Sequence, residues 1–75
     1  MKKSCFNRKA FGEKLKKTRN EREMSRGELA ELVMLSPQTI REYESGMRKP
    51  RTLHVVAICR ALKVKMDYLV FDEEN

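Results

Sequence analysis

Two helix-start signals lie close together in the middle of the sequence, and their spacing restricts the fold more than any other feature. The first is the capping box SRGE at positions 25–28, whose serine and glutamate side chains can satisfy backbone N–H groups at a helix start. The second is Ser36 before Pro37, because proline suits the first helical position, where no N–H is needed. A connection as short as residues 33–36 excludes a long antiparallel hairpin and predicts two short helices that cross steeply.

The N-terminal part of the chain has the pattern of an amphipathic helix. Asn7 is the expected N-cap, with Phe6 and Phe11 in the positions of a hydrophobic staple. The apolar stripe continues through Leu15. Asn20 is the expected helix end, because asparagine tolerates the left-handed conformation that often closes a helix.

Helix signals continue into the C-terminal half. Gly46 is expected to end the helix that begins at Pro37, and the segment MRKPR that follows it predicts a basic loop. Thr52 is expected to cap a largely apolar, buried helix over residues 53–62, and residues 66–71 to form a short final helix or turn. No segment has the alternation of a strand, so the sequence predicts an all-α fold of five short helices around one core.

The length and the charge of the chain restrict its function. At 75 residues it is one small domain, for which we expect a basic N-terminal arm over residues 1–7, a folded unit over 8–71 and an acidic tail over 72–75. The net charge is +6, and the positive excess lies in residues 1–60. Such a field attracts polyanions, which favours nucleic acid over an acidic membrane surface or an acidic protein. A basic surface with no partner is an alternative that charge alone does not exclude.

Residues that carry chemistry in enzymes and metal sites are sparse. Cys5 and Cys59 form no CxxC motif and His54 is the one histidine, so we expect no metal, no cofactor and no disulfide. A chain this short has little room for a catalytic cleft, and an enzyme is not expected. No apolar run approaches the roughly 18 residues of a membrane span, and no signal-peptide pattern follows the basic start. We therefore expect a cytoplasmic protein with no membrane partner.

The helix that begins at Pro37 has one apolar and one polar face. Ile40 and Tyr43 turn toward the core, and the small Ala30 in the preceding helix leaves room for a close crossing. The side chains on the opposite face can all hydrogen-bond to a flat polar partner; they are Gln38, Thr39, Arg41 and Glu42.

Motifs along most of the chain resemble those of one family. They are SRGELAELV at 25–33, SPQTIREYESG at 36–46, the loop ending RKP, and the pattern IC.AL.V….L from Ile58 to Leu69. Together they resemble the helix-turn-helix domain of phage repressors and Cro proteins, the Xre family of transcriptional regulators. The resemblance implies a five-helix, phage-repressor-like domain that binds double-stranded DNA as a symmetric homodimer, with the helix from Pro37 in the major groove.

The resemblance also implies that the polar face reads DNA bases. Gln38 can donate and accept at once, which suits the N6 and N7 edge of adenine. Glu42 can accept from cytosine N4, and Arg41 can reach guanine or a phosphate. For any one of these side chains, a solvated surface helix is an equally good interpretation, but not for the whole set. The expected base-reading residues are Pro37, Gln38, Thr39, Arg41 and Glu42.

Phosphate contacts are expected around this helix, because the helix itself has no strong positive excess. Arg26 stands where the family usually has a glutamine that touches phosphate and braces the helix from Pro37. We expect the arginine to keep the phosphate contact and to lose the bracing. The expected phosphate-binding residues are Arg26, Ser36, Arg48, Lys49 and Arg51, with Arg8, Lys9 and Lys14 as further candidates.

Three expectations concern stability. The family pairs an arginine of the first helix with the glutamate of its YE.G motif, and the matching residues here are Arg19 and Glu44. Met34 stands at a turn position usually held by glycine, where a left-handed backbone would cost about 1 kcal/mol. Lys63 and Lys65 replace a usual glycine and a usual capping serine, which leaves the start of the last helix weakly specified.

Dimerisation would have to use the last segment of the chain. The expected interface residues are Met66, Tyr68, Val70 and Phe71, whereas Leu69 matches a core position. Three functions are open. The first is a sequence-specific repressor on a palindromic operator. The second is a DNA-binding antitoxin, or a regulator controlled by a small protein antagonist, with residues 68–71 as the partner surface. The third is a protein-interaction module that has lost DNA binding, which Gln38 and the basic loop disfavour.

Overall fold

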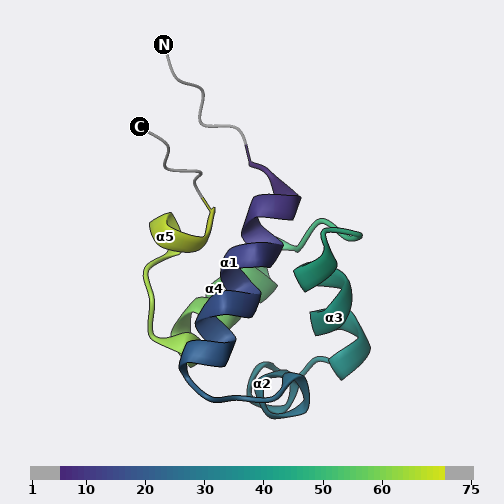
Figure 1. Cartoon of the computed structure of the whole chain (residues 1–75), viewed down its shortest axis with the longest axis vertical. Coiled ribbons are helices and arrows are strands. Elements are labelled where there is room, and N and C mark those ends of the chain that lie inside the picture. The colour runs from purple at the N-terminus through teal and green to yellow at the C-terminus, as the bar shows by residue number, and fades with distance from the viewer. Residues whose placement is uncertain (1–5, 71–75) are drawn as a thin grey trace.

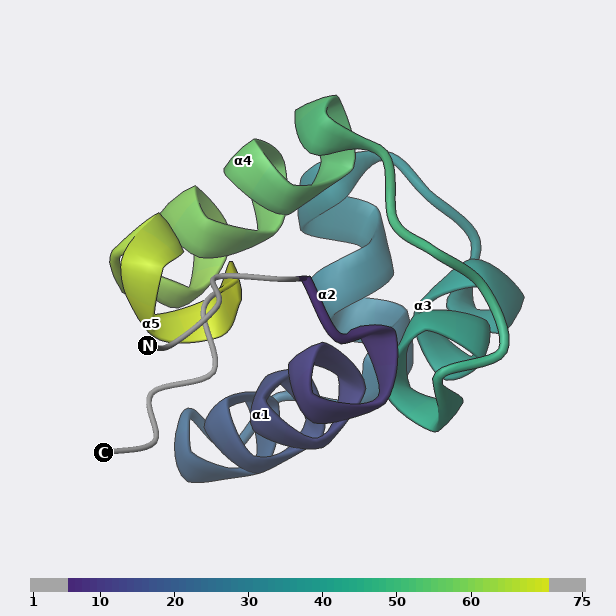
Figure 2. The same cartoon turned by 90° about the horizontal axis from the view of Figure 1, so that it is seen from above.

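The computed structural model describes residues 6–70, and within this range it contains five helices and no strand. The predicted all-α class is therefore confirmed. Seen along its shortest axis, the molecule has α3 on one side of α1 and α5 on the other, with α2 below (Figure 1). Seen from above, α3 and α5 lie at opposite ends of the molecule (Figure 2). The helices are α1 (Arg8–Glu21), α2 (Arg26–Val33), α3 (Pro37–Ser45), α4 (Thr52–Leu62) and α5 (Met66–Val70).

The predicted caps of the first three helices are present. Asn7 Oδ1 accepts hydrogen bonds from two backbone N–H groups in the first turn of α1, each at 3.0 Å. Ser25 and Glu28 form the full capping box, with contacts of 3.0 and 2.8 Å. Ser36 Oγ accepts from the backbone N–H of Thr39 at 3.1 Å. Each of these bonds closes within one helical turn, so residue spacing alone was enough to predict it.

Two predicted helix boundaries were wrong. α1 continues past Asn20 to Glu21, and the left-handed residue that follows is Glu23, with a φ of 56°. Asparagine tolerates that conformation but does not impose it. Thr52 is the first helical residue of α4 and not its cap. The N-cap is Arg51, whose side chain makes no capping hydrogen bond. An N-cap residue has an extended backbone, and Arg51 has one (φ −78°, ψ 148°). Thr52 follows it and is already helical, so Thr52 cannot be the N-cap.

Three helices end in a left-handed residue. Gly46 closes α3 with a φ of 80°, as its sequence position predicted. Met34 closes α2 with a φ of 58°, and Lys63 closes α4 with a φ of 59°. For a residue with a Cβ this conformation costs about 1 kcal/mol, so two of these turns are held by tertiary structure against the preference of the residue.

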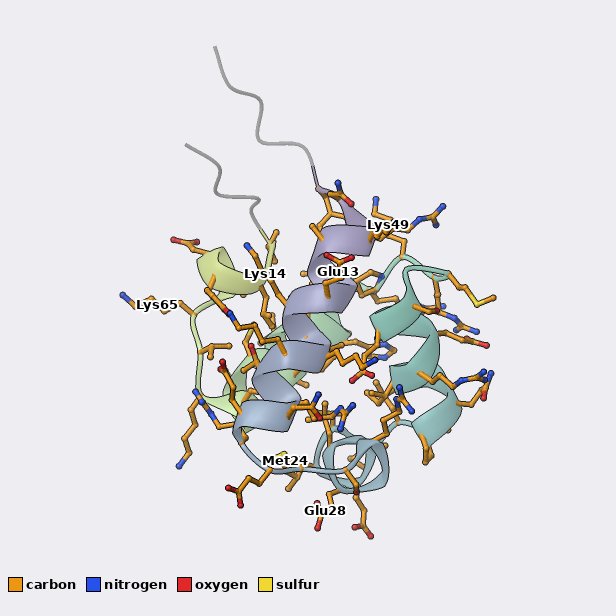
Figure 3. All side chains as sticks on the ribbon, viewed as in Figure 1. Glu13, Lys14, Met24, Glu28, Lys49 and Lys65 are labelled. Atoms are coloured by element: carbon orange, nitrogen blue, oxygen red, sulfur yellow. The ribbon has the colours of Figure 1, made fainter. Side chains whose placement is uncertain are left out.

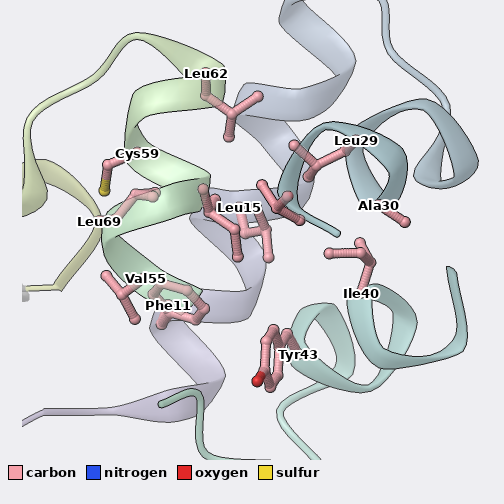
Figure 4. Close-up of a cluster of buried hydrophobic side chains, with 12 residues drawn as sticks. Phe11, Leu15, Leu29, Ala30, Ile40, Tyr43, Val55, Cys59, Leu62 and Leu69 are labelled. Carbon is pink, nitrogen blue, oxygen red and sulfur yellow. The ribbon is translucent and has the colours of Figure 1, made fainter. Parts of the chain in front are cut away.

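One hydrophobic core receives side chains from all five helices (Figure 4). Leu69 is buried in it, at 1% exposure, as the resemblance implied. α1 lies close against α3 at Gly12, where a Cβ atom would lie 2.4 Å from the carbonyl oxygen of Tyr43. The buried face of α3 is therefore fixed against α1. The core residues are Phe11, Leu15, Leu29, Ala30, Val33, Ile40, Tyr43, Val55, Ile58, Cys59, Leu62 and Leu69.

Candidate nucleic-acid interface

α3 has one buried face and one exposed face. Ile40 and Tyr43 are 0% and 1% exposed. On the other side Pro37, Gln38 and Arg41 are exposed, and Thr39 is half-buried. The helix thus presents a polar surface on a backbone that the core holds in place.

The polar side chains of α3 contact one another in series. Gln38 Nε2 donates to Glu42 Oε2 at 3.1 Å, and Arg41 Nη1 donates to Gln38 Oε1 at 3.5 Å. The carboxylate therefore attracts the amide nitrogen and the guanidinium attracts the amide oxygen, which sets the orientation of the Gln38 amide. One N–H on Nε2 and one lone pair on Oε1 remain. A donor and an acceptor on one amide match the N7 and N6 atoms of adenine in geometry.

Glu42 is engaged by a second partner that sequence analysis did not consider. Arg48 Nη2 lies 2.8 Å from Glu42 Oε1, and the Glu42 side chain is 24% exposed. The chain reverses at Gly46, where the backbone N–H of Met47 bonds to the Glu42 carbonyl at 3.1 Å, and this brings Arg48 back beside α3. If Glu42 contacted cytosine or Arg48 contacted a phosphate, that side chain would have to bind both partners at once or leave this ion pair.

The hydroxyl groups at the start of α3 are also engaged with each other. Ser36 Oγ lies 3.0 Å from Thr39 Oγ1, in addition to its capping bond. Ser36 is exposed, so its hydroxyl lies at the surface beside the first turn of α3. A phosphate at this position would compete with an intramolecular hydrogen bond.

A buried carboxylate holds two arginines where α1, α2 and α3 meet. Arg19 Nε and Nη2 donate to the two oxygens of Glu44 at 2.6 and 3.2 Å, so the pair that the resemblance implied is present and bidentate. Arg26 Nε donates to Glu44 Oε1 at 2.9 Å. The side chains of Glu44, Arg19 and Arg26 are 2%, 8% and 39% exposed. Two guanidinium groups thus compensate a carboxylate whose burial would otherwise be costly.

The expectation that Arg26 loses the bracing of the third helix was wrong. Through its bond to Glu44, Arg26 links the first turn of α2 to the last turn of α3. Arginine has five N–H donors, and the two terminal nitrogens of Arg26 form no hydrogen bond with any residue in the described range 6–70. Arg26 can therefore brace α3 through Nε and contact a phosphate through its terminal nitrogens at the same time.

The other expected phosphate-binding residues differ in their surroundings. Lys49 and Arg51 are exposed in the loop before α4. Lys9 lies beside the end of α3, because a Cβ on Gly46 would come within 3.2 Å of Lys9 Cα. Lys14 instead donates to the carbonyl oxygen of Tyr68 at 3.1 Å. Figure 3 shows Lys14 on the α5 side of α1 and Lys49 on the α3 side. Lys14 therefore does not join the basic groups around α3.

The predicted dimer surface is partly exposed. Met66 and Tyr68 are each 39% exposed, whereas Val70 is half-buried against the core. Phe71 lies outside the described residues. Met66 and Val70 also border a largely apolar groove between α5 and the start of α4. The other residues that line this groove are Phe6, Lys49, Pro50, Thr52 and Val55.

Two side-chain contacts had no signal in the sequence. The Tyr43 hydroxyl lies 2.7 Å from His54 Nδ1, and this contact joins α3 to α4. Arg22 Nε donates to the carbonyl oxygen of Leu62 at 2.9 Å, where α4 ends. Both pairs bridge separate helices, so their distance in space depends on helix packing and not on local spacing.

The remaining chemistry of the site is limited. Burial raises the pKa of the Cys59 thiol, which disfavours the reactive thiolate form. Within residues 6–70 no group of three or more His, Cys, Asp or Glu side chains is placed to hold a metal ion. None of the helices in that range has the length and apolar character needed to cross a membrane.

Comparison with known sequences identifies a family and a relative. A family model described as helix-turn-helix matches residues 15–69. The chain is 31% identical over 65 residues to the uncharacterized HTH-type transcriptional regulator YqaE of Bacillus subtilis. The matched region covers 87% of this chain and 56% of YqaE, so the chain spans little more than half the length of that relative.

Solved structures share the fold. The P22 c2 repressor, whose structure was determined with a synthetic operator, is 25% identical, with a TM-score of 0.77 over 80% of this chain and 91% of the repressor. The restriction-modification controller protein C.AhdI of Aeromonas hydrophila is 24% identical, with a TM-score of 0.80 over 84% of this chain and 91% of its own. Hydroxypropylphosphonic acid epoxidase of S. wedmorenis has the same fold in one part, with a TM-score of 0.79 and 24% identity over 87% of this chain but 35% of the enzyme.

Proposed function

The chain belongs to the Xre-like helix-turn-helix family of DNA-binding transcriptional regulators, and from that membership we propose that it represses transcription by binding a specific double-stranded sequence. α3 is the recognition helix and lies in the major groove of the DNA. Gln38 and Arg41 contact base edges, with Pro37 and Thr39 beside them.

One observation carries this proposal. The recognition helix is buried on one side, with Ile40 at 0% and Tyr43 at 1% exposure, and exposes an oriented amide and a guanidinium on the other. Base reading requires polar groups that are held in place by a rigid backbone and yet remain free to meet the DNA.

Affinity comes mainly from basic residues around the recognition helix. Arg26, Lys49 and Arg51 have exposed charge, and Lys9 lies next to the end of α3. Each phosphate that such a residue neutralises releases counterions, which supplies a free energy independent of base sequence. The third function left open by the sequence, a protein-interaction module without DNA binding, would not need basic residues grouped around α3.

We also propose that the protein acts as a symmetric dimer through α5. Met66 and Tyr68 expose apolar surface there, at the end of the molecule opposite to α3. Two recognition helices related by a two-fold axis would read half-sites whose centres are about 34 Å apart, one turn of DNA. The operator would therefore be palindromic.

Selection of duplexes from a random DNA pool tests the proposal. Wild-type protein should enrich a palindromic motif, and Gln38→Ala should reduce affinity for that motif about tenfold while leaving affinity for scrambled DNA unchanged. Asn20→Ala is the matched control, because it removes an exposed amide from α1 and should change neither affinity. Equal, weak binding of all duplexes by the wild type would contradict the assignment.

Sedimentation equilibrium over a range of protein concentrations tests the dimer. Wild-type protein should associate to a dimer, and Tyr68→Glu should weaken the association because it places a charge in an apolar contact. Glu13→Gln, an exposed change on α1, is the control and should leave association unchanged. A wild-type monomer at every concentration, binding single half-sites, would contradict the dimer.

A further inference from the structure

We propose that Glu44 positions Arg26 for a bidentate contact with one phosphate of the DNA backbone. The inference rests on the proposed function, since the phosphate belongs to the DNA that α3 reads. It assigns to a buried carboxylate, which cannot itself approach DNA, an indirect part in DNA binding.

The geometry of the guanidinium group is the first support. Arg26 bonds Glu44 through Nε, at 2.9 Å, and uses neither of its terminal nitrogens for any hydrogen bond within residues 6–70. Those two nitrogens form the end-on edge of a planar fork that matches two phosphate oxygens. Holding Nε fixes the plane of the group and leaves that edge available.

The rigidity of the carboxylate is the second support. Glu44 is held by both Nε and Nη2 of Arg19 and its side chain is 2% exposed, so it is an immobile anchor for Arg26. Arg19 also donates from Nη1 to the carbonyl oxygen of Met24 at 2.7 Å, in the turn before α2. The anchor is thus tied to the helix that carries Arg26.

Charge balance is the third support. One carboxylate faces two guanidinium groups, so the cluster has one uncompensated positive charge. Arg19 is buried at 8% side-chain exposure, whereas Arg26 is 39% exposed. The excess charge is therefore accessible to solvent at Arg26, where a phosphate group can neutralise it.

The test uses two arginine-to-lysine variants of the full chain. Arg26→Lys keeps the positive charge but removes the guanidinium group. Lysine has a single nitrogen, so it cannot bond Glu44 through one nitrogen and two phosphate oxygens through two others. Arg60→Lys is the matched control, since Arg60 is exposed on α4, has no ion pair within the described residues and is not among the proposed DNA-binding residues. Binding to the selected duplex and to scrambled DNA is measured by fluorescence anisotropy.

The expected result separates geometry from charge. Arg26→Lys should weaken binding to both DNAs about tenfold, because the oriented two-nitrogen contact is lost, while Arg60→Lys changes it less than about twofold. The slope of log affinity against log salt should stay at the wild-type value for Arg26→Lys, and should be shallower by about 0.9 for Arg26→Gln, which removes the charge.

The part played by Glu44 is tested by a double-mutant cycle. Glu44→Gln should weaken binding in the wild-type background and have no further effect in the Arg26→Gln background, because it acts through Arg26. Circular dichroism at the binding temperature gives the folded fraction, and affinities refer to folded protein. If Glu44→Gln does not fold, the comparison of Arg26→Lys with Arg60→Lys decides the proposal.

Three outcomes would overturn the inference. The first is that Arg26→Lys binds DNA as tightly as the wild type. The second is that Arg26→Lys loses affinity for the selected duplex alone, which would mean that the recognition helix is displaced. The third is that Glu44→Gln still weakens binding in the Arg26→Gln background. Failure of the proposed function itself looks different, because the wild-type protein would then prefer no duplex at all.

Discussion

Gly12 lies where the backbones of α1 and α3 are in close contact. A Cβ at this position would meet the carbonyl oxygens of Tyr43 and Glu44 at 2.4 and 2.5 Å, and both obstacles are backbone atoms of α3. Gly12→Ala should therefore push α1 away from α3 and destabilise the protein by about 3 kcal/mol. Urea denaturation followed by circular dichroism measures the change.

A second glycine provides the control for this prediction. Gly27 lies in an exposed part of α2, and a Cβ there would meet only Ser25 Oγ, at 3.8 Å. Gly27→Ala should stabilise the protein by about 0.5 kcal/mol, because alanine loses less conformational entropy in a helix. Equal effects at the two positions would show that helix propensity, and not the close approach at Gly12, determines the result.

Lys63 tests the cost of a left-handed backbone. Its φ of 59° suits glycine better than lysine, so Lys63→Gly should raise the free energy of unfolding by about 1 kcal/mol. The same substitution in the middle of α1, Lys16→Gly, should lower it by about 1 kcal/mol, since glycine is a poor helix former. A loss of stability at both positions would contradict the strain at Lys63.

At the scale of elements, α4 begins without the side-chain cap that α1, α2 and α3 have. Its N-cap, Arg51, makes no side-chain hydrogen bond to the first turn. Arg51→Asn should therefore stabilise the domain by about 1 kcal/mol in thermal denaturation, even though it removes a charge expected to bind DNA. Thr52→Ala should change stability by no more than a few tenths of a kcal/mol, because Thr52 is not the cap. A loss of about 1 kcal/mol in Thr52→Ala would restore threonine as the capping residue.

At the scale of the whole molecule, the distribution of charge governs how binding responds to salt. With about six phosphate contacts per bound protein, affinity should fall roughly a thousandfold between about 50 and 200 mM salt. The same salt range should affect scrambled DNA nearly as strongly, because phosphate contacts are independent of sequence. Binding that is insensitive to salt would argue against the proposed role of Arg26, Lys49 and Arg51.

The sequence by itself determined the number of helices, most of their boundaries and the face of α3 that is buried. The capping box at Ser25, the Ser36 cap and the Gly46 stop act through hydrogen bonds within one turn, so spacing along the chain contains the necessary information. The apolar period of α3 likewise specified that Ile40 and Tyr43 point inward. The Arg19–Glu44 pair was predictable only through the resemblance to a family.

Only the tertiary structure decided which partner each polar side chain takes. Arg26 was expected to leave α3 unbraced and instead bonds Glu44, and Glu42, expected as a base-reading residue, is paired with Arg48. Tyr43 likewise meets His54 across the α3–α4 loop. Long polar side chains can reach several partners, and the choice among them depends on helix crossing angles and loop closures. Those are set by the packing of the whole core and cannot be read from the spacing of residues.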